Sequence, residues 1–319
     1  MAPVPRRKPR IPPSPLPQRR GIDPVRLRLP RDGGWATVRD HLVDRLPVDP
    51  ETVDAMLHGG EVVAENGPLT LDTPYTGGIH VWFHRDLPTE VPVPFVIDVV
   101  YQDEHLLVAD KPHFLSTTPR GRHVTETALA RLRRDLDLPE LSPAHRLDRL
   151  TAGLVMFTVR PEDRGAYQSL FRDRQVHKEY EAVAAHTPAL TLPVSVRSRI
   201  EKVRGRIDAY EIPGEPNSES RIELLEHRAA LGRYRLLPHT GRTHQLRVHM
   251  NALGIPILGD PVYPAVTEPA PDDFGRPLQL LARTLEFTDP LTGRAHRFSS
   301  SRTLRAWTDY NEWATPPAA

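Results

Sequence analysis

The sequence predicts an α+β protein, because segments of helical and of strand periodicity follow one another without a regular strand–helix repeat. A doubly wound parallel sheet would require that regular alternation, and this chain does not show it. The length of 319 residues is sufficient for one large domain and one small domain. We therefore expect a large α+β domain preceded by a small α/β appendage.

The N-terminal segment has the composition of a tail. Its first twenty residues include seven prolines and no acid, and the basic residues are Arg6, Arg7, Lys8, Arg10, Arg19 and Arg20. Such a segment cannot bury a core, so we expect a disordered basic tail over residues 1–24. Two roles are compatible with it, namely non-specific phosphate contacts and solubility.

Residues 25–87 predict the small appendage. Apolar residues recur at helical spacing in two stripes, which are Val38, Leu42 and Leu46, and then Val53, Met56 and Leu57. A strand at residues 61–65 is expected to turn at residues 66–67. Two helices followed by strands resemble the small ribosomal-protein-type RNA-binding domain. Because acids offset the basic residues on these helices, both RNA binding and a purely structural role stay open.

The large domain is expected at residues 93–310, after a stiff linker that contains Pro88, Pro92 and Pro94. Periodicity predicts helices around residues 128–132 and 167–171. Strands are predicted at residues 95–100, 105–109, 176–183, 221–225, 234–237 and 242–250, with a final strand pair at residues 278–282 and 285–290.

The overall composition limits the class of protein. With 42 basic and 41 acidic residues the net charge is +1, so any surface for nucleic acid must be a local cluster. The absence of cysteine excludes disulfides and thiolate metal sites and fits a reducing compartment. No apolar run approaches the roughly 18 residues of a membrane span, and the N-terminus lacks a signal-peptide core. We expect a cytoplasmic protein without a membrane segment.

The most informative string is HRLDRLTAG at residues 145–153, which places Asp148 between Arg146 and Arg149. A carboxylate beside fixed positive charge stays ionised, which suits a nucleophile better than a proton donor. The alternative is a surface loop in which Asp148 pairs with a neighbouring arginine. A second string, GRTHQLRVH at residues 241–249, decides between the two readings.

Together the two strings resemble the signatures HRLDRxTSG and GRTHQxRxH of the RluA-type pseudouridine synthases, with Ala152 as the single departure. Lys111-Pro112 resembles the family's KPxG segment, although His113-Phe114 stand where a glycine is common. The resemblance implies a large, mixed and mostly antiparallel sheet. It also implies an isomerase that converts uridines of structured rRNA or tRNA to pseudouridine without cofactor or metal. Nothing in the sequence demands more than a monomer.

The resemblance gives Asp148 the catalytic role and Arg247 the role of its ion-pair partner. A buried arginine beside the carboxylate would hold it ionised and oriented. Read as a strand, residues 242–250 place Arg247 on one face with Thr243, Gln245 and His249. The alternative for Arg247 is a phosphate contact on the surface, with Arg242 as the substitute in either role. No second acid lies in either string, which argues against a glycosidase that uses two carboxylates.

Tyr180, in a segment that resembles the family's KxY motif, is expected to pack against the target base. The alternative is an ordinary core tyrosine. Leu280 is a further candidate for the pocket wall, although Leu281 stands where the family typically has a histidine.

The resemblance also implies contacts with RNA. Arg146 is expected to contact nucleotides as the target uridine is extruded, or else to brace the loop. The other expected substrate contacts are Arg149, Lys178, Arg242 and His244. His145 is read as structural. Because His244 and His249 point to opposite faces of the predicted strand and no cysteine or acid pair joins them, we expect no metal site.

Two rival functions follow from the same residues. A non-catalytic RNA-binding protein could keep the fold, but it has no need of a buried carboxylate that repels RNA. A glycosidic hydrolase would release free uracil, whereas a synthase would not.

Overall fold

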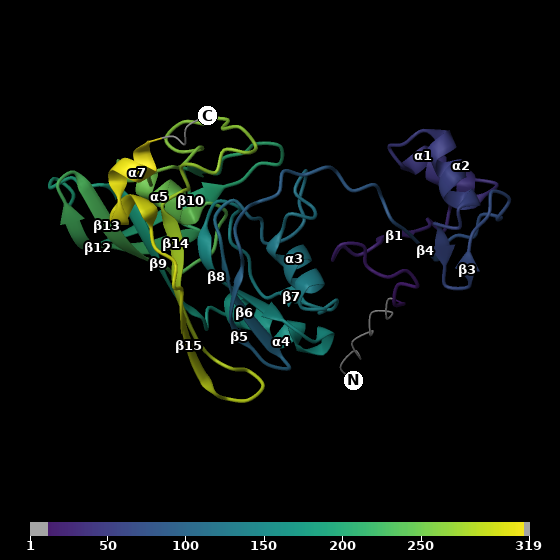
Figure 1. Cartoon of the computed structure of the whole chain (residues 1–319), viewed down its shortest axis with the longest axis horizontal. Coiled ribbons are helices and arrows are strands. Elements are labelled where there is room, and N and C mark those ends of the chain that lie inside the picture. The colour runs from purple at the N-terminus through teal and green to yellow at the C-terminus, as the bar shows by residue number, and fades with distance from the viewer. Residues whose placement is uncertain (1–11, 316–319) are drawn as a thin grey trace. The chain divides into compact units, whose positions relative to one another are not determined.

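The computed structural model describes residues 12–315, and the chain divides between Pro88 and Thr89 into two compact units (Figure 1). Within the described residues, no helix combines the length and the apolar character needed to cross a bilayer.

The small unit contains the two predicted helices. Its elements are β1 (Val25–Arg28), α1 (Val38–Arg45), α2 (Pro50–His58), β2 (Val63–Ala64), β3 (Gly67–Pro68) and β4 (His80–Phe83). Helix α1 begins with a capping box, in which Thr37 Oγ1 accepts the Asp40 N–H and Asp40 Oδ2 accepts the Thr37 N–H, both at 3.1 Å. The strands form an antiparallel sheet in the order β1-β4-β2-β3, and the apolar stripes pack on it.

Residues 12–24 differ from the predicted disordered tail. Arg19 and Ile22 exchange backbone hydrogen bonds of 3.0 Å, and Gln18 Nε2 donates to Asp23 Oδ1 at 2.7 Å. The carbonyl of Pro17 lies 2.9 Å from His84 Nε2 at the end of β4. Prolines fix φ, so this segment loses less backbone entropy on ordering than its polarity suggests. The rest of the predicted tail, residues 1–11, lies outside the described residues.

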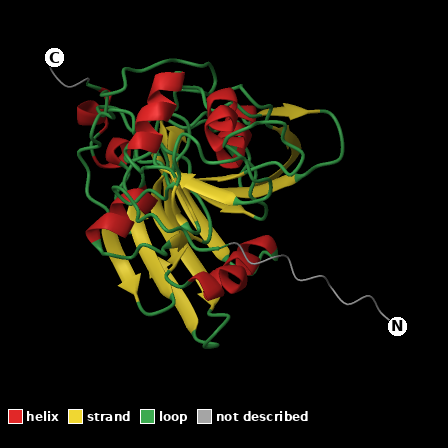
Figure 2. Ribbon diagram, turned by 90° about the vertical axis from the view of Figure 1, so that its right-hand side faces the viewer, coloured by secondary structure: helices red, strands yellow, loops and turns green. Residues whose placement is uncertain are grey.

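The large unit confirms the α+β prediction with a mixed, mostly antiparallel sheet (Figure 2). Within the described residues its strands are β5 (Asp98–Gln102), β6 (Leu106–Lys111), β7 (Ser142–Pro143), β8 (Ala152–Thr158), β9 (His177–Ala185), β10 (Val194–Glu201), β11 (Tyr210–Ile212), β12 (Ser218–Arg228), β13 (Leu231–Pro238), β14 (Leu280–Thr288) and β15 (Ala295–Ser299). The order is β11-β10-β12-β13-β9-β14-β8-β6-β5, with β15 on β14 and β7 on β8. Strands β8 and β14 run parallel.

Strands β6 and β8 are covered on both faces. The helices of this unit are α3 (Ala128–Asp135), η1 (Pro161–Asp163), α4 (Arg164–Arg172), α5 (Gln245–Ala252), α6 (Arg305–Thr308) and α7 (Tyr310–Ala314). Helix α3 packs on the face that carries Leu107 and Val155, and α4 packs on the face that carries Leu106 and Leu154. This double burial explains the continuous apolar run that follows the first signature string.

The predicted strand at residues 242–250 is wrong, because these residues form a loop and helix α5. Leu246 and Met250 are spaced four apart and pack together into the core beside β9 and β13, as on one helix face. The segment is short and mixes polar with apolar residues, so its pattern fits both periods.

The predicted final strand pair is also wrong. Residues 280–288 form the single strand β14, with a register shift between Ala282 and Thr284. It pairs antiparallel with β9 and with β15, and Asp289 Oδ1 holds the turn before β15 by accepting the N–H groups of Leu291 and Thr292 at 2.9 Å. This irregularity in the middle of β14 explains why the sequence pattern predicted two short strands in place of one.

The predicted linker beyond Pro88 is packed on the large unit. Glu90 Oε1 accepts the Thr125 N–H at 2.6 Å and its hydroxyl at 2.7 Å. Val93 is buried, and its N–H donates to Glu126 Oε2 at 2.7 Å. The prolines therefore stiffen a segment that belongs to the large unit.

Gly153 is required at the point where β8 meets β14. Its φ is +111°, and a Cβ there would lie 2.3 Å from the carbonyl oxygen of Ala282. We expect Gly153→Ala to lower the free energy of unfolding by roughly 3 kcal/mol or more, measured by urea denaturation. Gly165 in α4 is the matched control, since a Cβ there meets no atom within 4 Å. Gly165→Ala should be neutral or stabilise by about 0.5–1 kcal/mol. Equal effects of the two substitutions would contradict the steric argument.

Candidate active site

Asp148 lies in the loop that leads into β8. Thr117 fixes the backbone of this loop. Its hydroxyl donates to the Leu147 carbonyl at 2.8 Å and accepts the Leu147 N–H at 3.1 Å. The Thr151 N–H donates to the Asp148 carbonyl at 3.1 Å and closes the turn. With its backbone fixed in this way, the Asp148 side chain remains 34% exposed and can meet a ligand.

Lys111, at the end of β6, ties two loops of the site together. Its fully buried ammonium donates to the carbonyls of Pro112 at 2.9 Å, Leu115 at 2.7 Å and Arg149 at 3.4 Å. These three acceptors use all three of its N–H bonds. Burial lowers the pKa of Lys111 to about 7, against the opposing attraction of Asp148. Lys111 therefore fixes the backbone that follows Asp148.

Arg247 and Asp148 lie together, but their contact is not the strongest one that Arg247 makes. Arg247 Nη1 lies 3.5 Å from Asp148 Oδ2. Its Nε and Nη2 donate to the two carboxylate oxygens of Asp260 at 2.7 and 2.6 Å. The Arg247 side chain is 3% exposed, and that of Asp260 is fully buried. Arg247 is thus held by a bidentate pair, and one N–H group is left facing Asp148.

Asp260 was not identified in the sequence, because it lies outside both signature strings. It also accepts the N–H groups of Val262 at 2.9 Å and Tyr263 at 3.2 Å, in an Asx turn that follows the buried Ile257. The one signal in the sequence was an acid directly after an apolar segment, a pattern with many ordinary explanations.

Besides the Asp148 carboxylate, His244 Nε2 is a hydrogen-bond acceptor at this site. His244 has a left-handed φ of 58° at the start of α5, and its Nδ1 lies 3.0 Å from Tyr263 Oη. That hydroxyl donates its proton to the Ala209 carbonyl at 2.7 Å, so we assign the proton of this hydrogen bond to Nδ1. Burial lowers the pKa of His244 to about 4, which makes it neutral near pH 7. Its unprotonated Nε2 then lies 3.8 Å from Asp148 Oδ2.

Tyr180 and Leu280 lie on neighbouring strands at the edge of the core. Both pack in one apolar cluster with Leu150, two residues after Asp148. Burial raises the pKa of the Tyr180 hydroxyl, and the charge of Asp148 raises it further. Tyr180 therefore stays a neutral phenol near pH 7.

The remaining predicted contacts lie at varying distances from this centre. Arg146 is exposed and has no hydrogen bond or ion pair within residues 12–315. Arg149 is half-buried, and its Nη1 donates to the Phe114 carbonyl at 3.4 Å. Lys178 is half-buried on β9, where burial lowers its pKa. Arg242 is exposed, and its Nε donates to the Asn217 carbonyl at 3.1 Å.

His145 has a structural contact. Its Nε2 accepts the Met156 N–H at 3.1 Å, and its ring stacks on Phe171 with centroids 4.3 Å apart. An accepting nitrogen must be unprotonated, and burial accordingly lowers the pKa of His145 to about 3. In the part of the chain that the structure describes, no three histidine, aspartate or glutamate residues are grouped to hold a metal ion.

Comparisons with known proteins agree on one family. Residues 105–252 match the family model described as RNA pseudouridylate synthase. The dual-specificity RNA pseudouridine synthase RluA of Haemophilus influenzae is 32% identical over 224 residues, which cover 66% of this chain and 94% of that protein. Human pseudouridylate synthase RPUSD2 is 36% identical over 186 residues, which cover 57% of this chain and 33% of that protein. The solved structure of human RNA pseudouridylate synthase domain containing 4 has a TM-score of 0.52 at 22% identity, covering 68% of this chain and 94% of that one.

The buried pair of Arg247 and Asp260 should be expensive to break. Asp260→Asn leaves a buried guanidinium without its charged partner, so we expect a loss of about 3–5 kcal/mol in the free energy of unfolding. Asp208 pairs with Arg206 at 2.7 Å on the surface and provides the control. Asp208→Asn should cost far less, because solvent screens this pair. Denaturant titration measures both, and a similar small loss in both variants would count against the role given to Asp260.

His145 should contribute to acid sensitivity. Because its folded pKa is depressed, the unfolded chain takes up a proton below about pH 6.5 that the folded chain refuses. Stability should fall as the pH drops from about 6.5 towards 4, with about 1.4 kcal/mol per pH unit from this group. His145→Gln retains an acceptor for Met156 and should give a shallower pH profile of unfolding. Exposed His177 is the control, and an equal change in His177→Gln would contradict the assignment.

Proposed function

The chain belongs to the RluA-type RNA pseudouridine synthases, and on this premise we propose that Asp148 is the carboxylate that acts on the target uridine. The reaction breaks the bond between ribose and nitrogen 1 of uracil and joins the same ribose carbon to carbon 5. No atom is gained or lost, so the protein must supply one charged group, a support for the detached base and exclusion of water. The observation that carries the proposal is the half-exposed Asp148 carboxylate beside the fixed guanidinium of Arg247.

The geometry around Arg247 supports an electrostatic role. Asp260 holds the guanidinium in place whether or not a nucleotide is bound. The Nη1 group at 3.5 Å therefore favours the ionised form of Asp148 without having to reorient during the reaction. Asp148 itself keeps one side open to the substrate.

Tyr180 and Leu280 are proposed as the wall against which the uracil packs. Both pack with Leu150 directly behind the Asp148 loop, and Leu280 is 3% exposed. An aromatic ring beside an apolar side chain offers a dry surface to a planar base. The raised pKa keeps the Tyr180 hydroxyl protonated near pH 7, so it can donate a hydrogen bond to the detached base.

Arg146 is proposed to contact the RNA as the uridine leaves its stack. Its side chain is exposed and unpaired among the described residues, whereas a brace for the loop would need a partner. Extruding a base costs a few kcal/mol, which contacts in the pocket offset. Arg149, Lys178, Arg242 and His244 are proposed as further substrate contacts around the same loop.

The substrate is proposed to be a stem-loop of rRNA or tRNA in the cytoplasm, bound by a monomer without a cofactor. In the small unit, Arg39 Nη2 already donates to Asp54 Oδ2 at 2.9 Å. Because this arginine is neutralised, a structural appendage is favoured over an RNA-binding role for residues 25–87. Mapping pseudouridines in total RNA from cells with and without the gene would identify the target by the site that disappears.

Replacing the carboxylate tests the chemistry directly. Asp148→Asn should reduce pseudouridine formation by at least about a thousandfold, because the amide cannot supply the charge. RNA binding should be retained or become tighter, since a negative charge is removed. Chromatography of nucleosides from the treated RNA measures the product, and released uracil would indicate a hydrolase instead. Asp135→Asn, an exposed acid paired with Arg134, is the control and should turn over normally. Turnover in Asp148→Asn comparable to that control would refute the role.

A further inference from the structure

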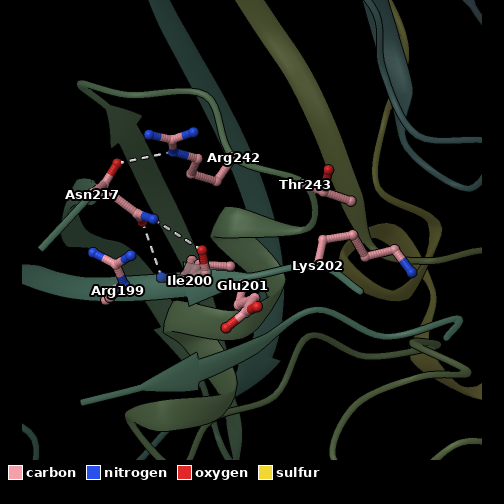
Figure 3. A pocket seen from close by; sticks show the side chains of 7 residues that line it. All are labelled: Arg199, Ile200, Glu201, Lys202, Asn217, Arg242 and Thr243. Carbon is pink, nitrogen blue, oxygen red and sulfur yellow. Dashed lines mark hydrogen bonds between the residues drawn. The ribbon is translucent and has the colours of Figure 1, made fainter. Parts of the chain in front are cut away.

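A pocket of about 360 Å³ lies next to the loop that carries His244. It is bounded by the end of β10, the start of β12 and the loop before α5 (Figure 3). The residues that line it are Arg199, Ile200, Glu201, Lys202, Asn217, Arg242 and Thr243.

The charges of this pocket are unusual for a chain with a net charge of +1. Three cationic side chains and one carboxylate line it. Arg199 and Glu201 are exposed on one face of β10, and their side chains have no hydrogen bond or ion pair among residues 12–315. Arg197, on the same face two residues earlier, instead pairs with Glu219 at 3.0 Å. Arg199 is thus a cation without a partner among the described residues, whereas the neighbouring Arg197 is paired with Glu219.

Asn217 forms a rigid floor between the two arginines. Its side-chain amide exchanges two hydrogen bonds of 3.0 Å with the backbone of Ile200. The backbone carbonyl of Asn217 accepts a hydrogen bond from Arg242 Nε at 3.1 Å. Both terminal nitrogens of Arg242 are then left without a partner within the described residues. Figure 3 shows Arg199 and Arg242 on either side of Asn217, with Lys202 extended past Thr243. Two guanidinium groups with open N–H bonds therefore flank one fixed amide.

The pocket is connected to the Asp148 site through the chain itself. Arg242 and Thr243 line the pocket, and the next residue, His244, lies 3.8 Å from Asp148. Lys202 also lines the pocket, and its Nζ donates to the Arg206 carbonyl. The pocket therefore lies next to the residue that faces Asp148, within reach of an RNA strand whose uridine is bound there.

We propose that this pocket binds a phosphodiester of the RNA strand beside the target uridine, with Arg199 and Arg242 as the two ligands of the phosphate. The inference rests on the proposed function and adds a binding site to it. A guanidinium matches two phosphate oxygens with parallel N–H bonds, and two such groups surround one tetrahedral anion. Glu201 opposes the anion and weakens the site, which allows the strand to leave after the reaction.

Arg199→Gln tests the phosphate contact. Binding of fluorescein-labelled oligouridylate is measured by anisotropy between about 50 and 200 mM salt. We expect the affinity to fall roughly five- to tenfold at low salt, and the slope of log affinity against log salt to decrease by about 0.7. Arg197→Gln removes a cation from the same strand face that is already paired with Glu219, and it should leave the slope unchanged. Equal slopes in wild type and Arg199→Gln would overturn the proposal.

Glu201→Gln gives a second result of opposite sign. Removing the one carboxylate of the pocket should tighten oligouridylate binding by roughly two- to fivefold at low salt. A purely structural role of residue 201 would predict no change or weaker binding. Unchanged or weaker binding in Glu201→Gln, with unchanged thermal unfolding, would therefore also overturn the proposal.

Two further measurements separate this inference from the role of Asp148 and from other anions. Arg199→Gln should raise the RNA concentration that gives the half-maximal single-turnover rate, whereas Asp148→Asn should lose turnover and keep the salt slope. Calorimetric titration with inorganic phosphate tests whether the pocket is a site for free small anions. If Arg199→Gln weakens phosphate binding but leaves oligouridylate binding intact, a free anion is the ligand and the proposal is wrong. If it weakens both, the phosphodiester is supported.

Discussion

The buried ion pair between Arg247 and Asp260 is the constraint on which the rest of the site depends. Two hydrogen bonds of 2.6 and 2.7 Å fix the guanidinium in a place where solvent cannot compete. Asp260 neutralises most of the charge of the Arg247 guanidinium. Asp148, 3.5 Å from Arg247 Nη1, is therefore only partly neutralised and stays accessible to a ligand. A single pair of Arg247 with Asp148 would have held the Asp148 carboxylate more tightly and left it less free for a ligand.

The fold brings this arrangement together from segments that lie far apart in the sequence. Lys111 at the end of β6 holds the backbone after Asp148, while β9 and β14 supply Tyr180 and Leu280. Helix α5 supplies Arg247, and His244 at its start is oriented by Tyr263. Each of these side chains is fixed by a hydrogen bond within the protein or by core packing, so the arrangement does not depend on a bound ligand.

The sequence predicted the α+β class and the family correctly, because both depend on long periodic segments and on two specific strings. It failed at residues 242–250, where the spacing of Leu246 and Met250 suits a helix but the alternation of polar residues suits a strand equally well. It missed Asp260, since a lone acid after an apolar segment carries no signal of its partner. Which carboxylate reaches Arg247 is decided by tertiary packing, and local pattern does not record it.

The double burial of β6 and β8 has a consequence for how the molecule selects its RNA. The loop with Asp148 leads into β8, which is covered by α3 on one face and by α4 on the other. The loop can therefore shift little when RNA binds. An enzyme that cannot bend towards its substrate leaves the bending to the nucleic acid. RNA loops whose bases are extruded at a low free-energy cost would then be modified first. The flexibility of the RNA would contribute to substrate selection in addition to its nucleotide sequence.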